Sequence, residues 1–252
     1  MAIELTTDEK IIVDEISKLC AELWARSEEI SGLNTDPKML SIMLFKRLWS
    51  HHRGFIVLWN AGLYLEADII LRAGLEAAIC IAANFNLGTE FVGIVRQDAA
   101  FTVQSQIKLM REGGEEDAVR EGEESLRMLQ AGLPDGVKAA KLNWSYLADK
   151  GGVPQLYGFH KHLSGVSAHV TGLSLMRGVI AGERSAELNV ELTALAKKMH
   201  VMMIAGATLH GALLHAGMID DAASAKSADA LITRMNDLSF AWPGVEPEAG
   251  RA

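Results

Sequence analysis

The stretch from Met199 to Ile219 contains no Asp, Glu, Lys or Arg, and this restricts the fold more than any other feature of the chain. Such a stretch is long enough to cross a lipid bilayer. It also carries three histidines and three glycines, and it is rich in Ala rather than Leu. Because Ala and Gly gain little free energy on entering lipid, the pattern favours a helix buried at the centre of a soluble protein.

Helical periodicity dominates the rest of the chain, and no run of alternating apolar and polar residues predicts a sheet. We expect an all-α fold, a single helical bundle of about seven to nine helices around an apolar central hairpin. The bundle is expected to occupy residues 1–238 as one domain. Residues 239–252, which include a Trp-Pro-Gly turn and a second proline, are predicted to form a disordered tail.

Local signals predict where several helices begin and end. Thr6 to Glu9 matches a capping box, and the helix it opens is expected to reach about Ile30. Asp36 followed by Pro37 is a helix start signal. The helix that begins there and the one after it, separated near residues 61–62, are the most apolar part of the chain and are interpreted as the central hairpin. Six further helices are predicted: one over 89–111, one that ends near 132, one that ends near 150, one that begins at 154, one over 185–217 and one over 221–238. A loop or short extended piece is expected at 169–180.

Composition limits the partners and the compartment. The formal net charge of −8 and the sequence pI of about 5.5 oppose non-specific binding to nucleic acid or anionic lipid. Cys20 and Cys80 lie inside apolar helical patterns without metal-binding spacing, so both are predicted to be buried thiols of a reducing compartment. The N-terminal residues contain no apolar signal core. We therefore expect a cytoplasmic protein with no membrane association.

Charged residues interrupt the apolar hairpin. In the first of its helices Arg47 and His51 lie one turn apart, and in the second Arg72 and Glu76 share a face that Glu66 borders. A buried charge without a partner costs several kcal/mol. The pattern therefore predicts a network of Arg47, Glu66, Arg72 and Glu76 across the hairpin. Two interpretations stay open: the network only fixes the register of the helices, or it forms the floor of a polar pocket.

A second polar cluster lies in the later helix that begins at Pro154 and comprises His160, His162, Ser164 and His169. Buried polar groups on separate helices are costly unless they satisfy each other or share a wet cavity. We therefore predict that this helix packs beside the hairpin. At least one of His160, Ser164 and His169 should reach a polar residue of the hairpin, directly or through one water. No cofactor is expected, because a metal site needs three or four converging ligands. The candidate binding residues are Arg47, His51, Glu66, Arg72, Glu76, His160, Ser164 and His169.

Three segments resemble, in order and spacing, a bacterial family of all-helical domains of unknown function. They are 47–54 (RLWSHHRG), 62–76 (GLYLEADIILRAGLE) and 160–169 (HKHLSGVSAH), and the resemblance covers about residues 40–172. It implies an all-helical fold. It also marks Arg47, Glu66, Arg72, Glu76, Ser164 and His169 as pattern positions, without naming a reaction.

A shorter pattern, Arg47 followed five residues later by His52, is similar to the Arg-then-His motif of the higher-eukaryote-and-prokaryote nucleotide-binding (HEPN) ribonucleases and toxins of bacterial defence. This resemblance implies metal-independent RNA cleavage, with the two side chains acting on the phosphodiester. Its candidate catalytic residues are Arg47, His51 and His52. The favoured hypothesis is a non-catalytic helical binding module whose polar cleft takes a small ligand or a protein partner. A homodimer is one form that such a module could take. The HEPN-like ribonuclease is the alternative, and only that alternative predicts nucleic acid as a partner.

Overall fold

The computed structural model describes residues 5–33, 36–134, 136–168 and 186–239, and it does not describe the side chains of 168, 186–193 and 239. These residues form nine α-helices and one π-helical turn, with no strand among them. The predicted all-α class and the number of helices are thus confirmed. The predicted piece at 169–180 and all of the predicted tail except Ser239 lie outside the described residues. The elements are α1 (Thr7–Glu28), α2 (Pro37–Asn60), α3 (Tyr64–Leu87), α4 (Thr89–Glu112), α5 (Glu116–Ala131), α6 (Trp144–Lys150), α7 (Pro154–Leu163), the π turn η1 (Ser164–Ala168), α9 (Ala186–Met218) and α10 (Ala222–Ser239).

The first helices begin where their caps predict. The Glu9 backbone N–H donates to Thr6 Oγ1 over 3.3 Å, and the Thr6 N–H donates to the Glu9 carboxylate over 2.8 Å, which completes the capping box of α1. The Asp36 carboxylate accepts from the Met39 N–H over 2.8 Å at the start of α2. Gly62, with φ +76°, supplies the left-handed residue of the turn between α2 and α3.

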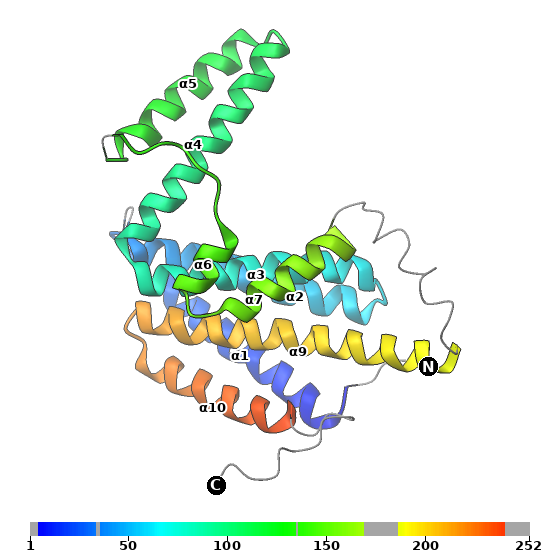
Figure 1. Ribbon diagram of the computed structural model, residues 1–252. Helices are drawn as coiled ribbons and strands as arrows, with labels where there is room; N and C mark the ends of the chain where they lie inside the picture. Colours follow the sequence, from blue (N-terminus) through cyan, green and yellow to red (C-terminus); the bar gives the residue numbers. More distant parts are fainter. Residues whose placement is uncertain (1–4, 34–35, 135, 169–185, 240–252) are drawn as a thin grey trace.

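Helix α9 is the centre of the bundle. It packs against α2 and α3 on one side and against α1 and α10 on the other (Figure 1). By length and composition its portion Ala194–Met218 could cross a membrane, but 61% of the most apolar window is buried within the protein. Val201, Ile204 and Leu209 have no exposed surface. The uncharged stretch is therefore a core helix of the bundle, as its composition predicted.

Two glycines of α9 allow close packing, and they differ in what surrounds them. A Cβ at Gly211 would overlap the Cδ2 of Leu48, a fully buried side chain of α2. A Cβ at Gly206 would lie 2.7 Å from the terminal Cε of Met235, a half-buried and flexible side chain of α10. Gly211 therefore sets the distance between α2 and α9, whereas the neighbour of Gly206 can move aside.

We expect Gly211→Val to lower the free energy of unfolding by about 1–3 kcal/mol more than Gly206→Val, because overpacking is costly where no neighbour can yield. Urea unfolding followed by circular dichroism measures the difference. The helix propensity change is the same at both positions and cancels in the comparison. Equal losses in the two variants would show that the contact between Gly211 and Leu48 does not limit the packing.

Helices α4 and α5 form an arm that projects from the bundle (Figure 1). No residue of α5 is buried. The chain returns from the arm along α4, where the Ala140 N–H donates to the Gln97 carbonyl and the Leu142 N–H donates to the Asp98 carboxylate. This return brings Trp144, the first residue of α6, back to the body of the bundle.

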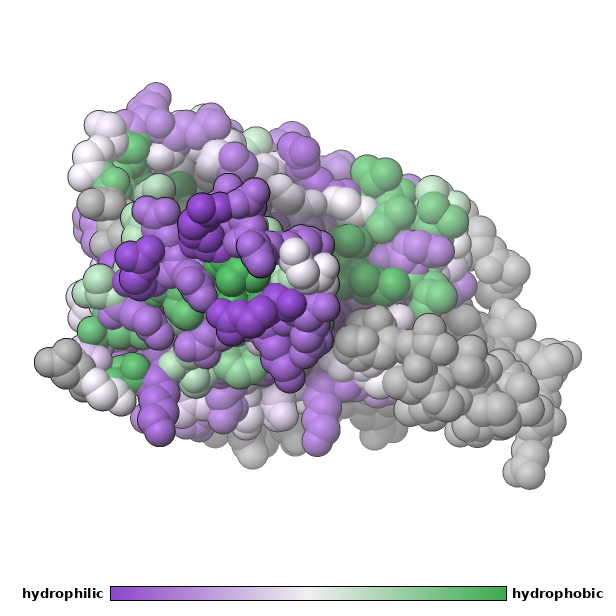
Figure 2. Space-filling model, turned by 90° about the horizontal axis from the view of Figure 1, so that it is seen from above, coloured by the Kyte–Doolittle hydropathy of each residue, from purple (hydrophilic) through white to green (hydrophobic). Residues whose placement is uncertain are grey.

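Seen from above, the hydrophilic arm lies beside a hydrophobic patch (Figure 2). That patch extends toward the turn between α2 and α3, where four large apolar side chains are exposed: Val57, Leu63, Leu65 and Ile69. Leu65 and Ile69 share a face of α3 with Arg72 and Glu76, so this face is exposed at its end near the turn. Farther along α3, where α7 covers the face, Arg72 and Glu76 are half-buried.

Candidate functional site

The predicted contact between the later helix and the hairpin is present. His160 Nε2 of α7 lies 2.9 Å from Glu76 Oε1 of α3, and Arg72 Nη2 lies 2.8 Å from the same oxygen. Arg72 Nε also donates to Ser164 Oγ over 2.8 Å. These four side chains form one continuous polar cluster. Four of the predicted binding residues, from α3, α7 and the π turn, therefore meet as the sequence indicated.

Ser164 occupies the point where α7 changes into the π turn. Its hydroxyl donates to the His160 carbonyl over 2.7 Å, which leaves an oxygen lone pair for the Arg72 guanidinium. Single π turns within helices occur often at functional positions. Here the turn fixes Arg72 from the α7 side while Glu76 fixes it from within α3.

Glu76 is the anionic centre of the cluster, with 20% of its side chain exposed. Burial by itself raises the pKa of this carboxyl group. The hydrogen bond from His160 and the charges of Arg72 and Arg47 outweigh that effect, so the net pKa lies below the ordinary value. Glu76 is therefore ionised at neutral pH and is held by two partners.

The His160 ring is packed between two aromatic rings. Its centroid lies 5.4 Å from that of Trp144 and 6.2 Å from that of Tyr157. Nε2 of the His160 ring is hydrogen-bonded to Glu76, whereas the buried Nδ1 has no hydrogen-bond partner in the part of the chain that the structure describes. The aromatic contacts hold the imidazole in one orientation toward α3.

Arg47 lies at the edge of the same cluster and is exposed. Its Nε donates to His51 Nε2 over 3.4 Å, and its charge helps to lower the Glu76 pKa. Partial burial and then Arg47 lower the His51 pKa, with Glu76 opposing them, so His51 is neutral at neutral pH. Among the described acidic side chains none lies within ion-pair distance of Arg47.

A pocket of about 390 Å³ opens beside this cluster, between α2, α3, α4 and the start of α6. Arg47 and Glu76 are the charged residues in its described lining, and the remaining walls are apolar or aromatic. Burial raises the pKa of the Cys80 thiol in the wall to about 12, so that group is a neutral thiol. The apolar walls are formed by Leu40, Met43, Leu44, Ala77, Cys80, Phe91, Val95, Leu142 and Trp144.

Glu66 does not join the network that the sequence predicted. It is exposed near the start of α3, and no described ion pair includes it. The reason is its place on the helix: Glu66 lies beside the surface residue Leu65, more than a turn away from the part of α3 that α7 covers. The predicted four-residue network is therefore reduced to the Arg72–Glu76 pair, with Arg47 nearby.

His52 lies in the core and not on the surface that carries Arg47. His52 has no exposed surface, and its Nδ1 lies 3.2 Å from Thr208 Oγ1 of α9. Burial lowers its pKa to about 4. His52 lies on the buried face of α2 with Phe45 and Leu48, whereas Arg47 lies on the face of α2 that lines the pocket. The predicted catalytic candidates are thus divided: Arg47 lines the pocket, His51 is hydrogen-bonded to Arg47, and His52 lies in the interior.

His169, the last of the predicted binding residues, lies outside the described residues. His162, which shares its helix with His160, is exposed and takes no part in the cluster. Within the described ranges no three His, Cys, Asp or Glu side chains gather as metal ligands would.

No protein-family model, curated protein or solved structure matches the chain. Its own geometry is therefore the basis for a functional proposal.

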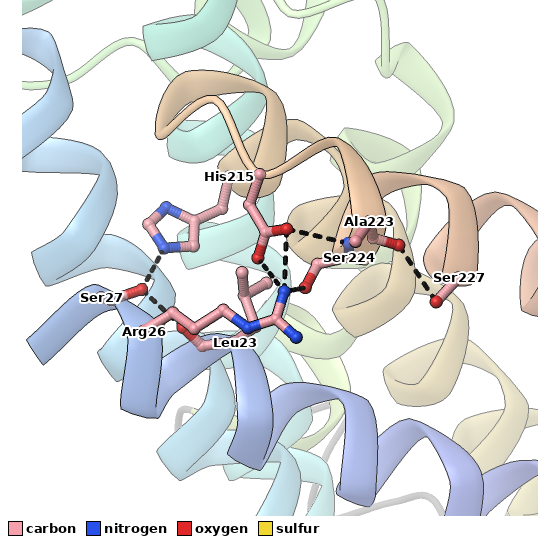
Figure 3. A network of polar contacts seen from close by, with 8 residues as sticks. Leu23, Arg26, Ser27, His215, Ala223, Ser224 and Ser227 are labelled. Carbon is pink, nitrogen blue, oxygen red and sulfur yellow. Dashed lines mark hydrogen bonds and ion pairs between the residues drawn. The ribbon is translucent and has the colours of Figure 1, made fainter. Parts of the chain in front are cut away.

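A buried polar cluster around His215 was not predicted (Figure 3). Ser27 donates to the Leu23 carbonyl over 2.7 Å, so its Oγ accepts from His215 Nε2–H over 2.9 Å. Nδ1 then accepts from the Ser41 hydroxyl over 2.8 Å, and the ring stacks on Phe45 at 4.5 Å between centroids. All its polar atoms are satisfied and His215 has no exposed area, so this cluster joins α1, α2 and α9 and does not form a site.

A sequence signal for this cluster exists in retrospect. Ser27 continues the buried stripe of α1 through Leu23, and Ser41 continues the buried stripe of α2 through Phe45. Polar residues on apolar stripes require buried partners. Beside the cluster, Arg26 pairs with Asp221 at 2.7 Å and also reaches Ser224 (Figure 3). That exposed pair ties the end of α1 to the start of α10.

Proposed function

We propose that this protein is a non-catalytic binding module that takes a small amphipathic molecule in the pocket between α2, α3, α4 and α6. The observation that carries the proposal is one apolar pocket of about 390 Å³ that ends on a cluster of charged side chains. Small-molecule sites in proteins have this size and this combination of apolar walls with a few polar groups. The walls would hold the apolar body of the ligand, and Arg47 or Glu76 would fix its polar end.

The HEPN-like ribonuclease receives less support from the same geometry. That activity needs the arginine and the histidine of the motif to reach one phosphodiester. His52 is buried against Thr208, and Arg47 is exposed at the pocket. The net charge of −8 also disfavours RNA as a partner. We therefore favour the binding module.

The proposal is tested with N-phenyl-1-naphthylamine, an uncharged probe that fluoresces when it enters an apolar site. We expect saturable binding to one site of the full-length protein. Val95→Trp fills the pocket from α4 and is expected to weaken probe binding by about tenfold or more, since the ring occupies the space of the ligand. Native mass spectrometry of the purified protein would also show whether a small molecule is retained.

The matched control is Val92→Trp. Val92 is half-buried on the same helix but does not line the pocket, so this variant should bind the probe as the unchanged protein does. Circular dichroism establishes that both variants keep their helical content. If the two variants bind equally well, the probe occupies another place and the proposed site is wrong.

A further inference from the structure

We infer that the ligand of the pocket is an amphipathic anion whose carboxylate or other anionic head binds Arg47. This inference rests on the proposed function and adds to it the charge of the ligand. It follows from the ion pairs of the cluster. Glu76 is held by Arg72 and His160, both at Oε1, while Arg47 is the cation of the described pocket lining without an acidic partner among the described residues.

The contacts of Arg47 leave its binding surface free. Nε donates to His51, and the two terminal nitrogens have no hydrogen-bond partner in the described part of the chain. His51 is neutral at neutral pH, so it orients the guanidinium without neutralising it. The planar pair of terminal nitrogens matches a carboxylate or phosphate, which it binds through two parallel hydrogen bonds.

The surroundings of Arg47 determine the rest of the ligand. Met43 and Leu44 precede it on α2 and line the pocket with Phe91 of α4. An apolar tail along these walls would leave water, and the anionic head would remain at the exposed Arg47. A cationic ligand would have to compete with Arg72 and His160 for Glu76, and it would face the positive charge of Arg47. The geometry therefore favours an anion.

Three compounds with the same tail test the charge of the head: octanoate, octanol and octylammonium. Each is titrated against bound N-phenyl-1-naphthylamine, and its displacement is measured by fluorescence. We expect octanoate to displace the probe at a concentration about tenfold lower than the other two, because a charge-assisted, two-point hydrogen bond is available only to it. Arg47→Gln should abolish this preference and leave displacement by octanol unchanged.

Lys46→Gln is the matched control. Lys46 is the adjacent cation on α2, but its Nζ lies over the Trp24 ring of α1 at 5.1 Å from the centroid, away from the pocket. This variant should keep the preference for octanoate.

If octanol or octylammonium displaces the probe as well as octanoate does, the pocket stands and the inferred charge of the ligand is wrong. The same holds if Arg47→Gln changes nothing. If the unchanged protein does not bind the probe, the proposed function fails and this inference fails with it.

Discussion

Acidification from about pH 6.5 to about pH 4 is expected to lower the free energy of unfolding by up to about 6 kcal/mol, because His52 and His215 are held neutral in the folded protein. Burial lowers the pKa of each from 6.5 to about 4. A shift of this size corresponds to about 3 kcal/mol for each group. His51 and His210, whose pKa values are also lowered by burial, act in the same direction.

The sign follows from proton binding. Between the two pKa values the unfolded chain binds a proton at each histidine and the folded protein does not, so acid favours unfolding. The stability that these histidines contribute is complete above the unfolded pKa of 6.5 and is lost as the pH falls toward the folded value of about 4. Below that value the two states bind the same number of protons at these sites.

Urea unfolding at a series of pH values measures this slope. His215→Gln is expected to be less stable at neutral pH, because Ser27 and Ser41 lose their partner, and to show a shallower decline in acid. His162→Gln changes an exposed histidine on α7 and should keep the full slope. An unchanged slope in His215→Gln would mean that the acid sensitivity of the protein has another source.

Replacement of Glu9 by Ala is expected to lower the free energy of unfolding by about 3–5 kcal/mol, the usual cost of breaking a buried ion pair. Glu9 is only 3% exposed, although it lies in the first turn of α1. One carboxylate oxygen accepts from the Thr6 N–H, and the other lies 2.8 Å from Lys198 Nζ of α9. The substitution removes the half of the capping box that the Glu9 side chain supplies, and it leaves Lys198, whose side chain is 18% exposed, without its partner.

Asp8→Ala is the control for this effect. Asp8 is the exposed neighbour in the same helical turn, so its loss should cost no more than about 1 kcal/mol through the helix dipole. A double-mutant cycle with Lys198→Met separates the ion pair from the cap, because only the ion pair contributes to the coupling energy. If Glu9→Ala costs no more than Asp8→Ala, the pair between α1 and α9 does not stabilise the fold.

The sequence allowed the helices to be predicted because helix ends depend on neighbours in the chain. The capping box at Thr6, the Asp36–Pro37 start and the glycine turn at Gly62 act within a few residues, and the structure places helix ends at or close to each. The uncharged stretch of α9 was likewise sufficient to predict a core helix. The polar cluster between separate helices could be predicted only in part. His160 and Ser164 contact Arg72 and Glu76 as expected, but Glu66 lies outside the cluster.

The rotation of each helix about its own axis was decided by the tertiary structure. Helix α2 is apolar on most of its circumference, so its sequence is compatible with more than one buried face. We expected the face that carries Arg47 and His51 to point inward or into a cleft. The structure buries Phe45, Leu48 and His52 instead and leaves Arg47 exposed at the pocket.

That difference is only one residue along the chain, yet it moves His52 into the core and leaves Arg47 at a pocket. Composition and local patterns determined that this protein is a helical bundle with polar residues in its hairpin. Which of those residues became a site depended on where α9, α7 and Trp144 covered the hairpin. Packing between helices distant in sequence fixes that choice, since no residue on α2 alone distinguishes a face that another helix buries from one that borders a cavity.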